Sequence, residues 1–179
     1  MVCCLGFFAF LRSGEFTVEN RHQFDPTWHL TLRDIEVDSQ EDPSMIKIHL
    51  KGSKTDQTRR GMDLHVGKIG NKLCPVAAIL AYLVVRGRDN GPLFRQKNGS
   101  PLSHQHLVQV LRYWLTAAGM DCSRYSGHSF RIGAATTAIA RGVPESIVQT
   151  LGQWESDSFK RYIRIPRQDL AADIEANGD

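Results

Sequence analysis

The chain has 179 residues, of which 41% are hydrophobic and 23% are charged. This is the size and composition of a single globular domain, and it excludes a disordered chain, a collagen-like repeat and a coiled coil. The 22 basic and 19 acidic residues give a net charge of only +3, so bulk charge does not indicate a nucleic-acid binder.

The charges are unevenly distributed along the chain. Residues 15–43 hold eight acidic and two basic residues, whereas residues 47–72 hold seven basic and two acidic ones. Residues 124–167 are again basic, with seven basic and three acidic residues. Two basic segments form either one positive face for a polyanion or two unrelated solvated stretches, and charge counts alone leave both open.

The first eleven residues are almost entirely apolar. They lack a basic leader and a small-residue cleavage site, and the run is too short to cross a bilayer, so we expect a buried helix and no membrane partner. None of the cysteines forms a C-x-x-C pair, and we expect all of them to be reduced in an intracellular protein. They are Cys3, Cys4, Cys74 and Cys122.

Strand-like alternation follows the first helix. It covers Thr27–Val37 and Ser44–Lys51, and a returning strand is predicted at Thr58–Val66, after the polar turn Gly52–Gln57. The second strand places Ile46, Ile48 and Leu50 on one face. These segments predict a small antiparallel sheet with a basic tip.

Helical signals fill the rest of the chain. Helices are expected from Pro75, from a Ser103 cap to Gly119, from about Gly127 to Arg141, from Pro144 to near Gly152, at Phe159–Ile163 and at Leu170–Ala176. Apolar periodicity predicts that Trp114 and Phe94 are core residues. The fold class is therefore α+β: a mostly helical single domain with a small antiparallel sheet near the N-terminus.

Four short motifs occur in a fixed order. His128 and Arg131 lie three residues apart in G-H-S-F-R-I-G-A-A-T, which places both on one helical face. In L-G-Q-W-E-S-D-S-F-K-R-Y-I-R, Tyr162 follows Gly152 by ten residues. With L-R-S-G-E at residues 11–15 and S-K-T at residues 53–55, the ordered set is Arg12, Lys54, His128, Arg131, Tyr162.

This ordered set resembles the catalytic domain of the tyrosine recombinases, the phage-integrase family. The wording H-S-F-R-I-G-A-A-T and R-Y-I-R is most similar to the recombinases of eukaryotic DIRS-type and crypton-type mobile elements. The resemblance runs from Leu5 to about Arg167 and implies that residues 1–179 are one tyrosine recombinase catalytic domain. It implies site-specific DNA recombination or integration of a mobile element.

The resemblance also implies a role for each motif residue. Tyr162 would attack the scissile phosphate and form a 3′-phosphotyrosyl link, and Lys54 would protonate the departing 5′-oxygen. Arg12 and Arg131 would grip the non-bridging oxygens, which suits the planar guanidinium. His128 would assist proton transfer and bind the phosphate, and Glu15 would orient its neighbours.

Two departures from the family pattern stand out. The family usually has His or Trp after the glycine of L-G-x, whereas this chain has Gln153, so either Gln153 or Trp154 would fill that role. The family also clamps DNA with a separate N-terminal core-binding domain. Here that domain is expected to be absent, and the chain is expected to begin inside the catalytic domain, as a fragment or a reduced descendant.

The implied partner is double-stranded DNA, with Lys51, Lys160, Arg161 and Arg164 as phosphate contacts. No cofactor and no metal are expected. Family members act as DNA-bound tetramers that exchange C-terminal segments; here residues 168–179 would form a tail helix, and the isolated chain would be monomeric. The expected location is intracellular, and nuclear if the source is eukaryotic.

Simpler interpretations remain open for several of these residues. Arg12 could be a solvated cap, Tyr162 could be a core residue, and Lys51 and Lys47 compete with Lys54. The basic residues near Tyr162 could be a soluble face. His104 and His106 are expected to be helix-cap residues, since no acidic or cysteine partner has ligand spacing nearby. Two alternative functions are a type IB topoisomerase and a DNA-binding module that lost turnover.

Overall fold

The computed structural model describes residues 1–20, 23–52, 61–154 and 156–163, and it describes only the backbone of residues 157, 161 and 162. The α-helices are α1 (Val2–Phe8), α2 (Ser13–Phe16), α3 (Pro75–Arg86), α4 (His104–Ala117), α5 (Ser129–Ala140) and α6 (Glu145–Leu151). The strands are β1 (Ile35–Val37), β2 (Met45–Leu50) and β3 (Met62–Gly67). Short 3₁₀ helices are η1 (Leu32–Asp34), η2 (Cys122–Arg124) and η3 (Asp157–Tyr162).

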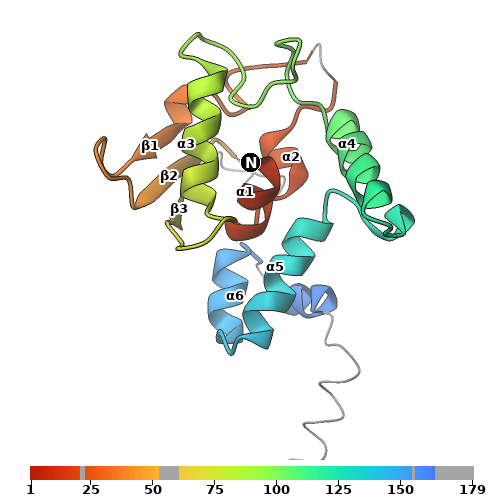
Figure 1. Ribbon diagram of the computed structural model, residues 1–179. Helices are drawn as coiled ribbons and strands as arrows, with labels where there is room; N and C mark the ends of the chain where they lie inside the picture. Colours follow the sequence, from red (N-terminus) through yellow and green to blue (C-terminus); the bar gives the residue numbers. More distant parts are fainter. Residues whose placement is uncertain (21–22, 53–60, 155, 164–179) are drawn as a thin grey trace, which may run out of the picture.

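The strands form one antiparallel sheet in the order β1-β2-β3. In its register Ile48 pairs with Ile35 on one side and with Leu64 on the other, and Ile46 pairs with Val66. The helix α3 crosses this sheet, and α1 and α2 lie beside it at the centre of the molecule (Figure 1). The predicted α+β class, mostly helical with a small sheet near the N-terminus, is confirmed.

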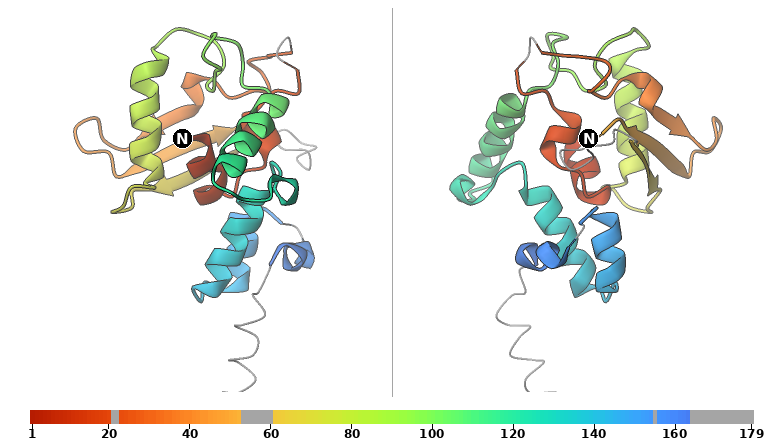
Figure 2. Two further views of the ribbon diagram at one scale, coloured as in Figure 1. Left: turned by 45° about the vertical axis from the view of Figure 1, so that its right-hand side comes forward. Right: turned by 180° about the vertical axis from the view of Figure 1, so that it is seen from behind.

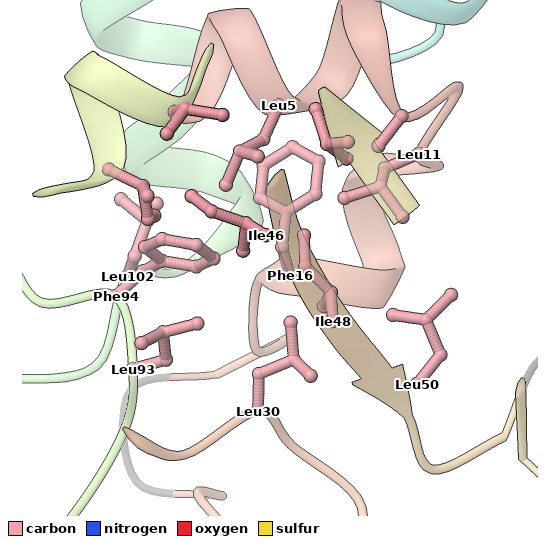
Figure 3. Close-up of a cluster of buried hydrophobic side chains, with 14 of the residues drawn as sticks. Leu5, Leu11, Phe16, Leu30, Ile46, Ile48, Leu50, Leu93, Phe94 and Leu102 are labelled. Atoms are coloured by element: carbon pink, nitrogen blue, oxygen red, sulfur yellow. The ribbon is translucent and has the colours of Figure 1, made fainter. Parts of the chain in front are cut away.

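The main core lies between the sheet, α1 and α3. Figure 3 shows the side chains of β2 reaching into it together with residues from the N-terminal helices and from the segment after α3. Ile46 and Ile48 are fully buried and Leu50 is nearly so, as the alternation predicts. Phe94 is also buried, which confirms its predicted place in the core.

A second, smaller core holds the C-terminal helices together. Its buried members are Phe10, Ala134, Ala135, Val148, Trp154 and Phe159. The helices α5 and α6 lie below the sheet-bearing part of the molecule, with η3 against them (Figures 1 and 2). Phe10 belongs to this smaller core, whereas the next residue, Leu11, belongs to the main core.

Several predicted helix boundaries are confirmed. Pro75 occupies the first turn of α3, where a missing N–H costs no hydrogen bond. The Ser103 hydroxyl caps α4 by accepting a hydrogen bond from the His106 backbone N–H at 3.2 Å. Gly142 follows α5 with a φ of 75°, and Gly152 ends α6.

The predicted strand Thr27–Val37 is wrong over most of its length. The Asp25 carboxylate accepts hydrogen bonds from the Thr27 backbone N–H at 2.8 Å and from its hydroxyl at 2.7 Å, which produces a turn. The Thr31 side chain and Asp34 then form a capping box that begins η1. Local side-chain hydrogen bonds therefore replace most of the strand, and Ile35–Val37 is the part that joins the sheet, while Thr31 makes one isolated bridge to Pro92.

The predicted place of Trp114 in the core is also wrong. Trp114 is 64% exposed and the neighbouring Tyr113 is 68% exposed, and of the helix α4 only Leu107 is buried. Figure 1 shows α4 at the edge of the molecule, away from the sheet. Periodicity correctly indicated an amphipathic helix, but most of its apolar stripe faces outward.

The remaining expectations concern the cysteines, membrane crossing and the C-terminal helices. All four cysteines are free, as predicted. Within the described ranges, no helix has the length and apolar character that crossing a bilayer requires. The expected short helix at Phe159–Ile163 is present as the 3₁₀ helix η3 rather than as an α-helix. The terminal helix expected at Leu170–Ala176, within the tail 168–179, lies outside the described residues.

Candidate active site

The sequence motif around Arg12 forms the beginning of α2. Arg12 is the N-cap residue, and Glu15 accepts one hydrogen bond from the Arg12 backbone N–H at 2.8 Å and another from its guanidinium Nη1 at 2.9 Å. The Glu15 side chain is only 5% exposed, whereas that of Arg12 is 25% exposed. A buried carboxylate thus fixes one edge of the guanidinium while part of it reaches solvent.

Arg12 and His128 line the same pocket, which has a volume of about 900 Å³. The other walls come from the segment around Trp28, from the first turn of α4 at His104, and from Gly52. His128 is the exposed N-cap residue of α5. Two of the predicted catalytic residues, from opposite ends of the chain, therefore converge on one concave surface.

Gly127 explains how these residues come together. A Cβ atom at Gly127 would lie 2.5 Å from the Ser13 hydroxyl and 2.9 Å from Cε1 of His104. The missing side chain lets the turn before α5 pack directly against α2 and α4. This close approach makes Gly127 and Ser13 parts of the site that the motif analysis missed. Only the glycine beside His128 was a signal for it.

Arg131 lies one helical turn after His128 but is 2% exposed. Its Nη1 donates to the carbonyl oxygen of Phe10 at 2.9 Å, and its Nη2 donates to the carbonyl oxygen of Gly152. Its guanidinium carbon also lies 4.1 Å from the centre of the Trp154 ring. Arg131 therefore joins the backbone before Arg12 to the backbone before Gln153.

Both of these backbone segments are strained. Phe10 has a φ of 53° and Gln153 a φ of 52°, and they are the two non-glycine residues with positive φ in the described part of the chain. Such conformations are unfavourable for residues with a Cβ and cost of order 1 kcal/mol or more. Phe10 itself carries one carbonyl that accepts from Arg131, and Gln153 directly follows Gly152, which carries the other.

Gln153 has a buried amide nitrogen. Among the described residues, its Nε2 is the buried side-chain atom that has no hydrogen-bond partner. An unpaired buried donor costs about 1–3 kcal/mol and calls for an explanation. Neither Gln153 nor Arg131 is among the described residues that line the 900 Å³ pocket.

Trp154 is a core residue rather than a pocket residue. It is 8% exposed and packs edge-on against Phe10, at 6.4 Å between ring centres. Its contact with Phe159 is tilted, at 5.9 Å between ring centres. A Cβ at Gly152 would collide with this ring at 1.5 Å, so the glycine is required by the position of Trp154. Of the two candidates for the position after L-G, Trp154 thus packs in the smaller core, whereas the Gln153 amide nitrogen has no hydrogen-bond partner among the described residues.

The structure describes the other predicted site residues to different extents. Tyr162 and Arg161 end η3 and have described backbones, and Lys54 and Arg164 lie outside the described residues. Lys160 is exposed, with its Nζ 3.4 Å from Glu145.

Lys51 is engaged within the fold instead of facing a ligand. Its Nζ donates to the carbonyl oxygens of Pro26 at 2.6 Å and His29 at 3.1 Å, and it lies 2.8 Å from the Asp34 carboxylate. Its side chain is 16% exposed. These contacts favour a structural role over the predicted phosphate contact.

His104 and His106 lie in the first turn of α4. His104 faces the pocket, and His106 is positioned by the Ser103 cap. Across the residues with described positions, no cluster of three His, Cys, Asp or Glu side chains could hold a metal ion.

A sequence profile of the phage integrase family matches residues 29–167 of the chain. The chain belongs to the phage integrase family. Arg12 and Glu15 precede the matched segment, so their assignment depends on the L-R-S-G-E motif and on the shared pocket.

Individual family members are distant in sequence and similar in fold. An integrase/recombinase XerD homologue from Selenomonas ruminantium is 25% identical over 129 residues, covering 68% of this chain and 38% of that protein. The XerH site-specific recombinase, in a post-cleavage complex with palindromic difH substrate, superposes with a TM-score of 0.67 at 18% identity. The XerA recombinase also gives 0.67 at 18%, and the Tn1549 transposon integrase bound to circular intermediate DNA gives 0.56 at 12%.

These superpositions cover 97–98% of this chain but only 45%, 55% and 56% of the XerH, XerA and Tn1549 chains. The chain thus spans about half the length of the recombinases whose structures it matches. At these identities the likeness establishes the recombinase catalytic-domain fold.

Proposed function

We propose that this chain cuts and rejoins DNA strands through a 3′-phosphotyrosyl intermediate, with Tyr162 as the nucleophile. The observation that carries the proposal is the convergence of Arg12 and His128 on one pocket in a member of the phage integrase family. A cationic arginine and an imidazole on one concave surface suit a phosphodiester that must gain negative charge in its transition state.

The reaction needs a bond to form at phosphorus as another breaks. The Tyr162 phenolic oxygen attacks the phosphorus, its proton passes towards His128, and the bond from phosphorus to the 5′-oxygen breaks. Lys54 donates a proton to that oxygen, which leaves as a 5′-hydroxyl. Because a phenol has a reference pKa of about 10, positive charge near the phosphate is needed to favour the attacking phenolate. Rejoining is the reverse reaction, with a 5′-hydroxyl as the attacking group.

The described contacts suggest different roles for the two arginines: Arg12 contacts the phosphate, and Arg131 positions the backbone of the site. Arg12, partly exposed in the pocket, contacts the non-bridging oxygens directly. Arg131 holds the Phe10 and Gly152 carbonyls and thereby sets the positions of Arg12 and Gln153. The direct grip on phosphate that the family resemblance implies for Arg131 would use N–H groups that are not bonded to these carbonyls, and it requires the buried guanidinium to become accessible when DNA binds. Gln153 does not line the pocket, and its buried amide nitrogen becomes a further donor to the phosphate if this segment shifts when DNA binds.

The proposed substrate is double-stranded DNA, in site-specific recombination or integration of a mobile element of the DIRS or crypton type. Strand exchange requires two duplexes, so we propose a tetramer on DNA and a monomer without it. Lys160, Arg161 and Arg164 would add phosphate contacts near the nucleophile. On the same resemblance, the protein acts inside the cell, and in the nucleus of a eukaryotic host.

Covalent capture of DNA tests the chemistry directly. The purified chain is incubated with nicked duplexes that carry randomised sequence around the nick, so that the cleaved strand loses its short 5′-hydroxyl fragment and cannot be rejoined. Denaturation, protease digestion and mass spectrometry then identify the peptide that carries DNA. The expected adduct is on Tyr162.

Two tyrosine variants supply the controls. Tyr162→Phe should abolish the adduct and leave DNA affinity nearly unchanged, because it removes a nucleophile and no charge. Tyr113→Phe, on the exposed face of α4, should retain the adduct. An adduct that persists in Tyr162→Phe contradicts the assignment of the nucleophile. Binding without any adduct in the unaltered chain favours the DNA-binding module instead.

A further inference from the structure

The pocket that contains Arg12 and His128 has a second, chemically different wall. Trp28 lines it and is 50% exposed, beside His29 and with Glu19 also on the lining. The volume of about 900 Å³ is that of a site for a drug-sized organic molecule and is far larger than one phosphate group fills. The motifs of the family resemblance use only the Arg12 and His128 part of this space.

The turn that carries Trp28 is held firmly in place. The Asp25 carboxylate accepts two hydrogen bonds from Thr27, and the Trp28 backbone N–H donates to the Asp25 carbonyl oxygen at 3.0 Å. These Thr27 hydrogen bonds also lower the pKa of Asp25, so the turn keeps its charged cap. An indole on an ordered turn loses little conformational entropy when a flat ligand stacks on it.

Lys51 ties this turn to the sheet. Its ammonium group bonds the carbonyls of Pro26 and His29, on either side of Trp28, and pairs with Asp34. Lys51 directly follows β2, and the next residue, Gly52, is itself on the pocket lining. The anchor of the Trp28 turn is therefore continuous with the strand that leads towards the S-K-T motif.

The two kinds of wall suit different parts of one ligand. Arg12 and His128 favour a phosphate, whereas the exposed Glu19 carboxylate would repel one and the Trp28 ring offers an aromatic face. Every nucleobase has a π-face that stacks on such a ring, and stacking of this kind is tolerant of sequence. A nucleotide carries both the anion and the flat ring.

We propose that this pocket holds one nucleotide of the cleaved strand, with its phosphate against Arg12 and His128 and its base, removed from the helical stack, against Trp28. The inference rests on the proposed function for the identity of that strand. Trp28 is then a binding residue that favours DNA whose bases are free to leave the stack.

Binding of single-stranded and duplex DNA tests this inference. The probes are a dT oligonucleotide and a fully paired blunt duplex of equal length, and affinity is measured by fluorescence anisotropy. Trp28→Ala should weaken binding of the dT oligonucleotide about tenfold or more, the loss expected for one base–aromatic stack, and should change duplex binding much less. Trp28→Phe should restore most of the affinity, because phenylalanine can also stack.

Trp114 supplies the matched control, since it is 64% exposed on α4 and lines a different hollow. Trp114→Ala should leave binding of the dT oligonucleotide unchanged. In a Trp114→Phe protein, whose remaining tryptophans are Trp28 and the buried Trp154, the dT oligonucleotide should quench the emission. Circular dichroism confirms that each variant is folded.

The outcomes separate this inference from the proposed function. Equal affinity of the unaltered chain and Trp28→Ala for the dT oligonucleotide overturns the inference, and so does an equal loss in Trp114→Ala. Absence of a phosphotyrosyl adduct overturns the proposed chemistry and leaves the comparison of these variants as it is.

Discussion

Arg131 donates a hydrogen bond at 2.9 Å to the carbonyl oxygen of Phe10, a residue 121 positions earlier in the chain and two residues before Arg12. The same guanidinium bonds Gly152, immediately before Gln153. One buried cation thus connects α5 to both of the strained turns on which the site is built.

Replacement of Arg131 should affect both stability and activity. Arg131→Ala leaves the buried Phe10 and Gly152 carbonyls without this donor and should lower the free energy of unfolding by about 3 kcal/mol. Arg131→Lys retains a charge but loses the planar fork, so it should fold better than the alanine variant while forming adduct about 100-fold more slowly. Urea denaturation and adduct kinetics measure the two effects. Normal adduct formation in Arg131→Lys contradicts the positioning role.

Gln153 should show the opposite relation between stability and activity. Its Nε2 has no partner among the described residues, so Gln153→Leu should leave the free energy of unfolding unchanged or raise it. The same substitution should slow adduct formation by about 100-fold, the usual effect of losing one transition-state donor. Gln153→His restores the type of residue that the family uses there and should recover activity. A Gln153→Leu protein that is unstable and fully active contradicts this interpretation.

Glu15 should act through Arg12. Glu15→Gln keeps a group that can accept the hydrogen bond from the Arg12 backbone N–H but removes the charge that fixes the guanidinium. Misplacement of Arg12 should slow adduct formation about tenfold with little loss of DNA affinity. Single-turnover kinetics over a range of DNA concentrations distinguish these two quantities. A change in affinity alone argues that Glu15 affects binding instead.

DNA binding should be weak and should depend steeply on salt. Phosphate contacts release counterions, so the logarithm of the association constant should fall linearly with the logarithm of the salt concentration. Because the proposed reaction invokes no metal ion, EDTA should change neither binding nor adduct formation. Titrations between 50 and 200 mM salt, about the range over which such contacts lose affinity, measure the slope. A chelator-sensitive adduct contradicts the mechanism.

Assembly should depend on DNA and on the C-terminal tail. Leu170, Ala171 and Ile174 have helical spacing, and so short an apolar stripe buries too little area for a stable interface without DNA. Light scattering should find a monomer alone and a larger complex on DNA. Removal of residues 168–179 should abolish cooperative assembly on DNA while leaving the catalytic pocket intact. A tetramer without DNA contradicts the expectation.

Local patterns predicted the elements better than they predicted the site. Alternation at Ile46, Ile48 and Leu50 and the caps at Pro75 and Ser103 are decided by neighbouring residues, and these predictions are confirmed. The predicted strand at residues 27–34 failed because Asp25 and Thr31 bond their own backbone neighbours, and this competes with sheet pairing.

The environment of the site residues could not be predicted in the same way. The spacing of His128 and Arg131 correctly placed them one helical turn apart, yet His128 is exposed and Arg131 is buried. That difference depends on Phe10 and Gly152, which are distant in sequence. Trp114 fails for a related reason, because periodicity shows which side of a helix is apolar and does not show whether anything covers it.

The division of Phe10 and Leu11 between the two cores has a consequence for local unfolding of the molecule. Consecutive side chains enter two different cores, so Arg12 is anchored beside the larger one, whereas Gln153 and η3 belong with the smaller one. A small core with few buried side chains is expected to open at a lower free energy than the sheet-bearing core. Hydrogen exchange should therefore find α5 and α6 exchanging together, ahead of β2. In such a partly open molecule Arg131 and His128 would move away with α5, and the Phe10 carbonyl two residues before Arg12 would lose its donor. The candidate site would then be disassembled without global unfolding.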